Sequence, residues 1–91
     1  MKIPFSFSYP LTPAQFAVLV PKLSSNPAIK SITLVNNGAE IVTADVTLTG
    51  SFNGIDRLLV TVTAQHSLAA HLASDAQAQE HITELLAKAV Q

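Results

Sequence analysis

Two stretches of the chain alternate apolar and polar residues with a period of two, which strongly limits what the chain can fold into. They cover residues 42–48 and 58–64, and apolar side chains occupy every even position. Because successive side chains of a strand point to opposite faces, each stretch predicts a strand that buries one face. This pattern is typical of an antiparallel sheet covered on one side. The other face is predicted to carry Thr43, Asp45, Thr47, Thr49, Thr61 and Thr63.

The first quarter of the chain predicts a strand followed by a helix. Residues 2–10 alternate polar and apolar side chains, and Pro4 lacks a ladder donor, so this strand is expected at a sheet edge. Thr12-Pro13-Ala14-Gln15 combines an N-cap, a proline at the first helical position and a reciprocal capping residue. The helix that follows is expected to kink at Pro21, or to end near Val20 and resume as a short turn.

Residues 29–65 predict three strands with loops at residues 36–38 and 51–55. A two-residue turn at either place would bring even positions opposite odd ones and mix the two faces. Face parity therefore favours three-residue loops, with Val46 opposite Val60, Ile32 opposite Val42 and Gly54 in the left-handed conformation.

The tail, residues 67–91, has apolar residues at helical spacing. In an unbroken helix Asp75 would lie in the apolar stripe, where an unpaired carboxylate is costly. Ser74-Asp75-Ala76-Gln77 has the form of a capping box. A break before Ser74 is therefore expected, with Asp75 as a favourable acid in the first turn of a new helix.

These elements predict a single α+β domain over residues 1–91, with a four-stranded, mainly antiparallel sheet in the order β-α-β-β-β-α. Both helices are expected on one face of the sheet. A right-handed crossover through the first helix is expected to leave the first strand parallel to the second or the fourth strand.

Composition limits the partners. Charged residues make up 12% of the chain and the net charge is −1, so little repulsion keeps copies apart and self-association is favoured. The five basic residues are scattered, which disfavours a nucleic-acid partner. Double-stranded-RNA-binding domains share the order of a helix, three strands and a helix, but residues 67–71 and 74–77 contain no lysine or arginine. The first ten residues resemble neither a signal peptide nor a membrane span, so no membrane partner and a cytoplasmic location are expected.

Few residues suggest a catalytic or metal-binding role. His66, His71 and Asp75 could form a metal or catalytic group, with His81 as a further ligand, because residues 71 and 75 are one helical turn apart. A surface or junction hydrogen bond explains such a pair more simply, so no metal, cofactor or catalytic residue is predicted.

The sequence therefore favours a non-catalytic interaction module that forms a dimer, with the threonine-bearing sheet face as its interaction surface. One alternative is a carrier of a small apolar ligand, with a cavity lined by Phe5, Phe7, Phe16 and Leu72 between the C-terminal helix and the sheet. A small enzyme or metal site using His66, His71 and Asp75 is another alternative. The preference of threonine for exposed strand positions also explains the threonine pattern without any function.

Overall fold

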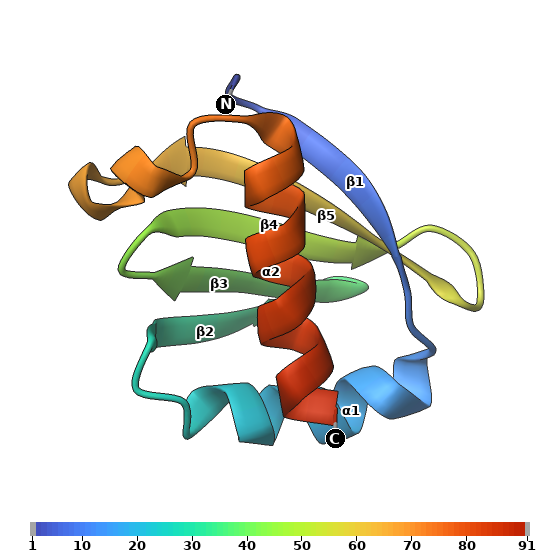
Figure 1. Cartoon of the computed structure of the whole chain (residues 1–91). Helices are drawn as coiled ribbons and strands as arrows, with labels where there is room; N and C mark the ends of the chain where they lie inside the picture. Colours follow the sequence, from blue (N-terminus) through green and yellow to red (C-terminus); the bar gives the residue numbers. More distant parts are fainter. Residues whose placement is uncertain (1, 91) are drawn as a thin grey trace.

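The chain forms a five-stranded antiparallel sheet and two α-helices (Figure 1). The computed structural model describes residues 2–90, so Met1 and Gln91, the ends of the predicted domain, lie outside the described residues. Along the sheet the strands lie in the order β1-β5-β4-β3-β2, and all neighbours are antiparallel. The elements are β1 (Phe5–Pro10), α1 (Pro13–Ser24), β2 (Ile29–Val35), β3 (Gly38–Thr43), β4 (Val46–Phe52), β5 (Arg57–Gln65), the 3-10 helix η1 (Ser67–His71) and α2 (Asp75–Val90).

The α+β class is confirmed, but the predicted count of four strands is wrong because a turn divides the expected third strand. The Oγ1 of Thr43 accepts hydrogen bonds from the backbone N–H groups of Asp45 and Val46, at 3.1 and 3.0 Å. Its hydroxyl also donates to the carbonyl oxygen of Val46, at 2.9 Å. A threonine side chain thus replaces ladder bonds and reverses the chain between β3 and β4.

This extra turn also reverses the direction of every later strand. The predicted parallel pairing of the first strand is wrong, because β1 pairs antiparallel with β5. The expected edge position of β1 is confirmed, and Phe5, Phe7 and Tyr9 lie opposite Val62, Val60 and Leu58.

The turn changes which residues of β3 are buried. Ala39, Ile41 and Thr43 are buried in β3, whereas Val46, Leu48 and Gly50 are buried in β4. The expectation that Val42 shares the buried face with Val46 is therefore wrong. The predicted three-residue loop at residues 36–38 is wrong: Val35 pairs with Gly38 across a two-residue turn, and Ile32 lies opposite Ile41 instead of Val42. Because the odd positions of β3 point inward, this turn keeps the two faces consistent.

In the β4–β5 hairpin, the expected pairing of even-numbered with even-numbered residues is confirmed, but the expected register is wrong. Even residues lie opposite even residues from Leu48 to Phe52, yet Val60 lies opposite Gly50 instead of Val46. The predicted three-residue loop is also wrong, because residues 53–56 join the two strands. The ring of Phe52 packs edge-on against the ring of Phe16, with centroids 5.3 Å apart. The N–H of Asn53 bonds to the carbonyl of Arg57 across the loop, and Gly54 has the predicted positive φ, 102°.

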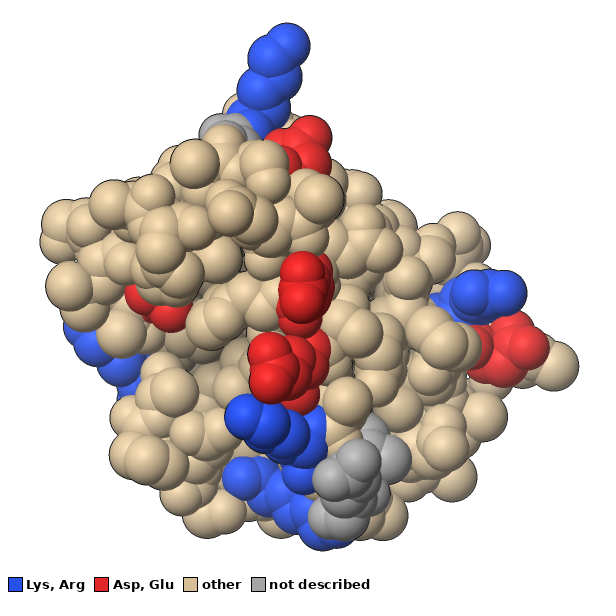
Figure 2. Space-filling view, in the orientation of Figure 1, with Lys and Arg blue, Asp and Glu red and all other residues tan. Residues whose placement is uncertain are grey.

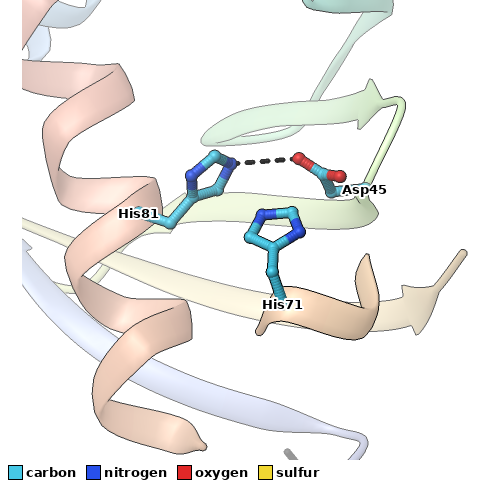
Figure 3. Close-up of side chains that lie close together, drawn as sticks. All are labelled: Asp45, His71 and His81. Carbon is cyan, nitrogen blue, oxygen red and sulfur yellow. Dashed lines mark ion pairs between the residues drawn. The ribbon is translucent and has the colours of Figure 1, made fainter. Parts of the chain in front are cut away.

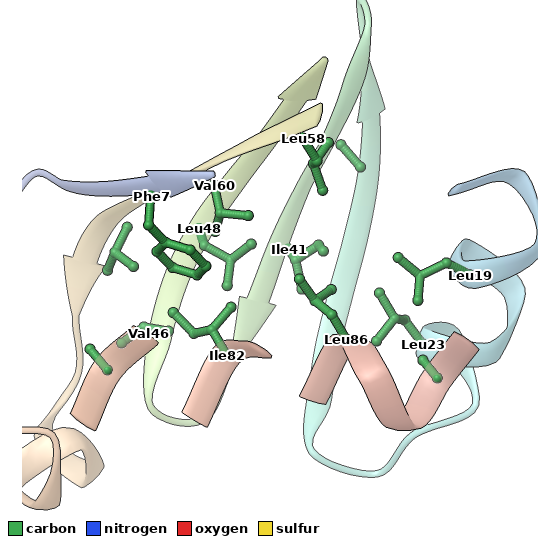
Figure 4. Close-up of a cluster of buried hydrophobic side chains, with 14 of the residues drawn as sticks. Phe7, Leu19, Leu23, Ile41, Val46, Leu48, Leu58, Val60, Ile82 and Leu86 are labelled. Atoms are coloured by element: carbon green, nitrogen blue, oxygen red, sulfur yellow. The ribbon is translucent and has the colours of Figure 1, made fainter. Parts of the chain in front are cut away.

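The core lies between one face of the sheet and the helices. Figure 1 shows α2 lying across the sheet, and α1 packs against α2 and β2. Leu19 and Leu23 of α1 are fully buried beside Leu86 of α2 (Figure 4). Other buried residues that Figure 4 labels are Phe7, Ile41, Val46, Leu48, Leu58, Val60 and Ile82.

The helix boundaries follow the capping signals. The capping box of Thr12 and Gln15 is present, and α1 continues through Pro21 to Ser24 instead of ending near Val20. The predicted break before α2 is confirmed: Gln77 N–H donates to Ser74 Oγ at 3.2 Å, and the Ser74 N–H bonds to the Gln77 side chain. Among residues 2–90, no helix is long and apolar enough to span a membrane.

Candidate functional site

The face of the sheet turned away from α2 carries hydroxyl side chains on β1, β2, β4 and β5, whereas Glu40 occupies the corresponding position on β3. Thr47, Thr49, Thr61 and Thr63 alternate with buried residues of β4 and β5, as predicted. We call these four residues the threonine face. Thr49 lies opposite Thr61, and the Oγ1 of Thr61 lies 3.0 Å from the Oγ of Ser6 on β1.

The other two residues predicted for this surface do not belong to it. Thr43 is 4% exposed and its hydroxyl is used inside the β3–β4 turn. Asp45 lies in the same turn and directs its carboxylate toward α2 (Figure 3). Both predictions are corrected for one reason: they assumed a strand that continues through residues 43–45, where the chain instead turns.

The aromatic residues proposed to line a cavity belong to the core. Phe7, Phe16 and Leu72 are at most 9% exposed, and Phe5 is partly buried against the same cluster. The rings of Phe5 and Phe7 contact each other, with centroids 5.8 Å apart. Three surface hollows lie along α2; Leu72 lines one of them, but none of the three is lined by Phe5, Phe7 or Phe16.

A second polar cluster joins three elements that are distant in the sequence. His81 of α2 places its Nε2 3.2 Å from Oδ2 of Asp45. The ring of His71, at the end of η1, lies edge-to-face with the ring of His81, with centroids 5.6 Å apart. One ligating atom from each of the three residues lies within 4.8 Å of the other two. Figure 3 shows the three side chains converging on one point. We call Asp45, His71 and His81 the histidine–aspartate cluster.

Each member of this cluster is held by its local structure. The backbone of Asp45 is fixed on both sides, since its N–H bonds to Thr43 and its carbonyl accepts from the N–H of His66 at 2.8 Å. His71 lies two residues after Ala69, which is completely buried, and directly before Leu72, which is 2% exposed. His81 precedes Ile82, which is 1% exposed, so α2 is anchored at this point. The three side chains therefore project from firmly packed backbone.

The surroundings of the cluster are acidic. His71 and His81 line a hollow of about 210 Å³ together with Glu80 and Glu84. Glu84 also lies 3.5 Å from Lys88 in an exposed pair. Figure 2 shows acidic side chains along α2 on a face that is otherwise mostly uncharged. Carboxylates around a hollow raise the local concentration of cations.

The structure rearranges the group that the sequence suggested. Among the described residues, the cluster contains His71 and His81 but neither His66 nor Asp75. The Nε2 of His66 lies 3.0 Å from Oγ1 of Thr47, and Asp75 occupies the first turn of α2, as predicted. Asp45 was missed as a partner of the histidines because the turn that brings it to α2 depends on a buried threonine. The Thr-x-Asp spacing of residues 43–45 is a turn signal that could have indicated it.

Comparison with known proteins yields no match to any protein-family model, to any curated protein or to any solved structure.

Proposed function

We propose that this protein is a non-catalytic interaction module that forms a homodimer through the threonine face. The observation that carries the proposal is a row of mostly short, neutral side chains on the sheet face away from α2. One row crosses all five strands at paired positions, and it consists of Thr33, Glu40, Thr49, Thr61 and Ser6.

The size of the face suits a dimer of standard dimensions. Five strands spaced about 4.8 Å apart, each about seven residues long at about 3.3 Å per residue, give a projected area of roughly 550 Å². A side chain surface of this extent is close to the roughly 600–800 Å² per partner at the lower end of stable interfaces. Two twisted sheets can stack face to face with their strands about 30° apart.

The polarity of the face favours a second copy as the partner. Threonine methyl groups are apolar and the hydroxyls bond to each other or to water, so burial brings little charge desolvation. Glu40 is the charged member of the row. A two-fold axis along β4, the central strand, would place β3 of each copy over β5 of the other. Glu40 would then approach the hydroxyl of Thr61 of the second copy instead of the other glutamate, which avoids like-charge repulsion.

The proposal is tested by placing lysines at the centre of the face. We expect the wild type to be a dimer in size-exclusion light scattering, and Thr49→Lys combined with Thr61→Lys to be a folded monomer. The matched control combines Ala76→Lys with Gln79→Lys, which adds the same charge to exposed positions of α2. The control should remain dimeric.

Two outcomes would contradict the proposal. The first is a wild-type protein that light scattering shows to be monomeric even at high protein concentration. A double-lysine variant that remains dimeric, with an unchanged circular dichroism spectrum, places the contact on another surface.

A further inference from the structure

The geometry points to a second site on the helix side of the molecule: Asp45, His71 and His81 bind one divalent transition-metal ion, with Zn²⁺ as the best fit. This goes beyond the proposed dimer, because the site and the threonine face lie on different sides of the sheet. The observation that carries it is the convergence of two imidazoles and one carboxylate from the β3–β4 turn, η1 and α2 (Figure 3).

The spacing of the ligating atoms matches a tetrahedral site. With zinc–ligand distances of about 2.0–2.1 Å, two ligands of a tetrahedral ion are about 3.3 Å apart. The Nε2 of His81 and Oδ2 of Asp45 are already 3.2 Å apart. The farthest pair of ligating atoms is within 4.8 Å, so a shift of at most about 1.5 Å brings all three to coordinating distance. The side chains of His81 and Asp45 are partly exposed and can make this movement by small rotations.

The hydrogen bond of His71 prepares it for a metal. Its Nδ1 lies 3.1 Å from the carbonyl oxygen of Leu68, and a carbonyl only accepts, so Nδ1 carries the proton. In the neutral ring, Nε2 is then the nitrogen with the free lone pair. Metal-ligating histidines usually donate their other N–H to a carbonyl or carboxylate, which fixes the tautomer. His71 has this arrangement through the carbonyl oxygen of Leu68.

The donor set selects the class of ion. Imidazole nitrogens suit zinc, copper, nickel and iron, whereas calcium and magnesium require oxygen ligands. Two histidines and one aspartate are three protein ligands, which leaves a coordination position for water or another donor. Because both histidines line the hollow with Glu80 and Glu84, the ion stays open to solvent on that side.

The ion would join elements that are otherwise connected at this point by a partly exposed His81–Asp45 pair and by the ring contact of His71 with His81. The side chains of His81 and Asp45 are 39% and 20% exposed, so their direct interaction contributes little to stability. A bound metal would fix η1, the β3–β4 turn and α2 to one another, and it would stabilise the folded state because the unfolded chain has no such site.

The test is a zinc titration of the purified full chain by isothermal calorimetry, after removal of metal with a chelator. We expect one Zn²⁺ per chain. His71→Ala should weaken binding by more than about 100-fold, because even changes in outer-shell partners cost about 10–100-fold. Asp45→Asn and His81→Ala should do the same. In NMR spectra, zinc should shift the ring signals of His71 and His81.

The matched control is His66→Ala, which removes the one histidine outside the cluster and should keep the wild-type affinity. Because His71 is exposed, the His71→Ala variant should fold normally. Its melting temperature in chelator should equal that of the wild type, which checks this. The inference is overturned if the wild type binds no stoichiometric zinc. It is equally overturned if His66→Ala weakens binding as much as His71→Ala, since the site would then lie elsewhere.

Discussion

The carboxylate of Asp45, in the turn between β3 and β4, lies 3.2 Å from the Nε2 of His81 on α2. The two residues are 36 positions apart in the sequence. The pair connects the end of a hairpin to the helix that covers the sheet, and His71 completes the cluster. Asp45 therefore belongs both to the β3–β4 turn and to the proposed metal site.

Removing the Asp45 charge should have a small effect on the metal-free protein. Both side chains are partly exposed, and exposed ion pairs contribute about 0–1 kcal/mol, so Asp45→Asn should lower the free energy of unfolding by no more than about 1 kcal/mol. Urea denaturation in chelator measures this, with Asp56→Asn in the exposed β4–β5 loop as control. A loss of several kcal/mol would show that Asp45 has a larger structural role.

Adding zinc should show the role of Asp45 as a ligand separately from its small effect on the metal-free protein. At a free zinc concentration of about 100 times Kd, a ligand that binds only the folded state stabilises it by about 2.7 kcal/mol. For a domain of this size that corresponds to a rise in Tm of roughly 10–20 °C. Asp45→Asn should lose most of this rise. An equal rise in wild type and variant would contradict a ligand role for Asp45.

Thr43 should act as a positioning residue for Asp45. Thr43→Val keeps the shape of the side chain but leaves the N–H groups of Asp45 and Val46 without their acceptor, which should cost about 1–3 kcal/mol. It should also weaken zinc binding, whereas Thr43→Ser keeps the hydroxyl and should retain both properties. Calorimetry and urea denaturation of the two variants test this. Equal stability of Thr43→Val and wild type would refute the importance of the side-chain turn.

Gly54 should resist β-branched residues for conformational reasons alone. Its φ is 102°, and a Cβ there would meet no atom within 4 Å, so steric overlap with neighbours is excluded. Gly54→Val should cost about 1–2 kcal/mol because a β-branched residue tolerates positive φ poorly. Gly54→Asn should cost less, since asparagine adopts this region more readily. Thermal unfolding measures the difference, and equal Tm values for the two variants would be evidence against this explanation.

Gly38 should resist substitution for the opposite reason. A Cβ on Gly38 would overlap the backbone carbonyl of Gly50 on the neighbouring strand. Backbone cannot move aside as a side chain can, so Gly38→Ala should cost at least about 1–3 kcal/mol. Gly50→Ala is the control for the loss of a glycine and should cost less, because a Cβ there would meet only side-chain atoms of Leu58, the nearest at 3.2 Å. If urea denaturation shows Gly38→Ala to be as stable as wild type, the two strands are not in such close contact.

The sequence by itself determined the features that depend on local patterns. Alternation in β4 and β5 identified the buried residues Val46, Leu48, Val60 and Val62 and the exposed threonines, because side chain direction in a strand has a fixed period. The capping signals at Thr12 and Ser74 located both helix starts, since they satisfy nearby backbone groups.

Tertiary structure decided what depends on contacts between distant residues. A continuous strand through residues 43–45 and a turn there are both compatible with the local sequence. Odd-numbered residues such as Ile41 are buried in β3, whereas even-numbered residues such as Val46 are buried in β4, so the chain turns between them. The Thr43 hydroxyl accepts a hydrogen bond from a backbone N–H group that would otherwise lack a partner in this turn. That turn added a strand, reversed β5 and brought Asp45 to His81. Spacing along the chain suggested His71 with Asp75, whereas packing of α2 against the sheet placed His71 beside His81 and Asp45.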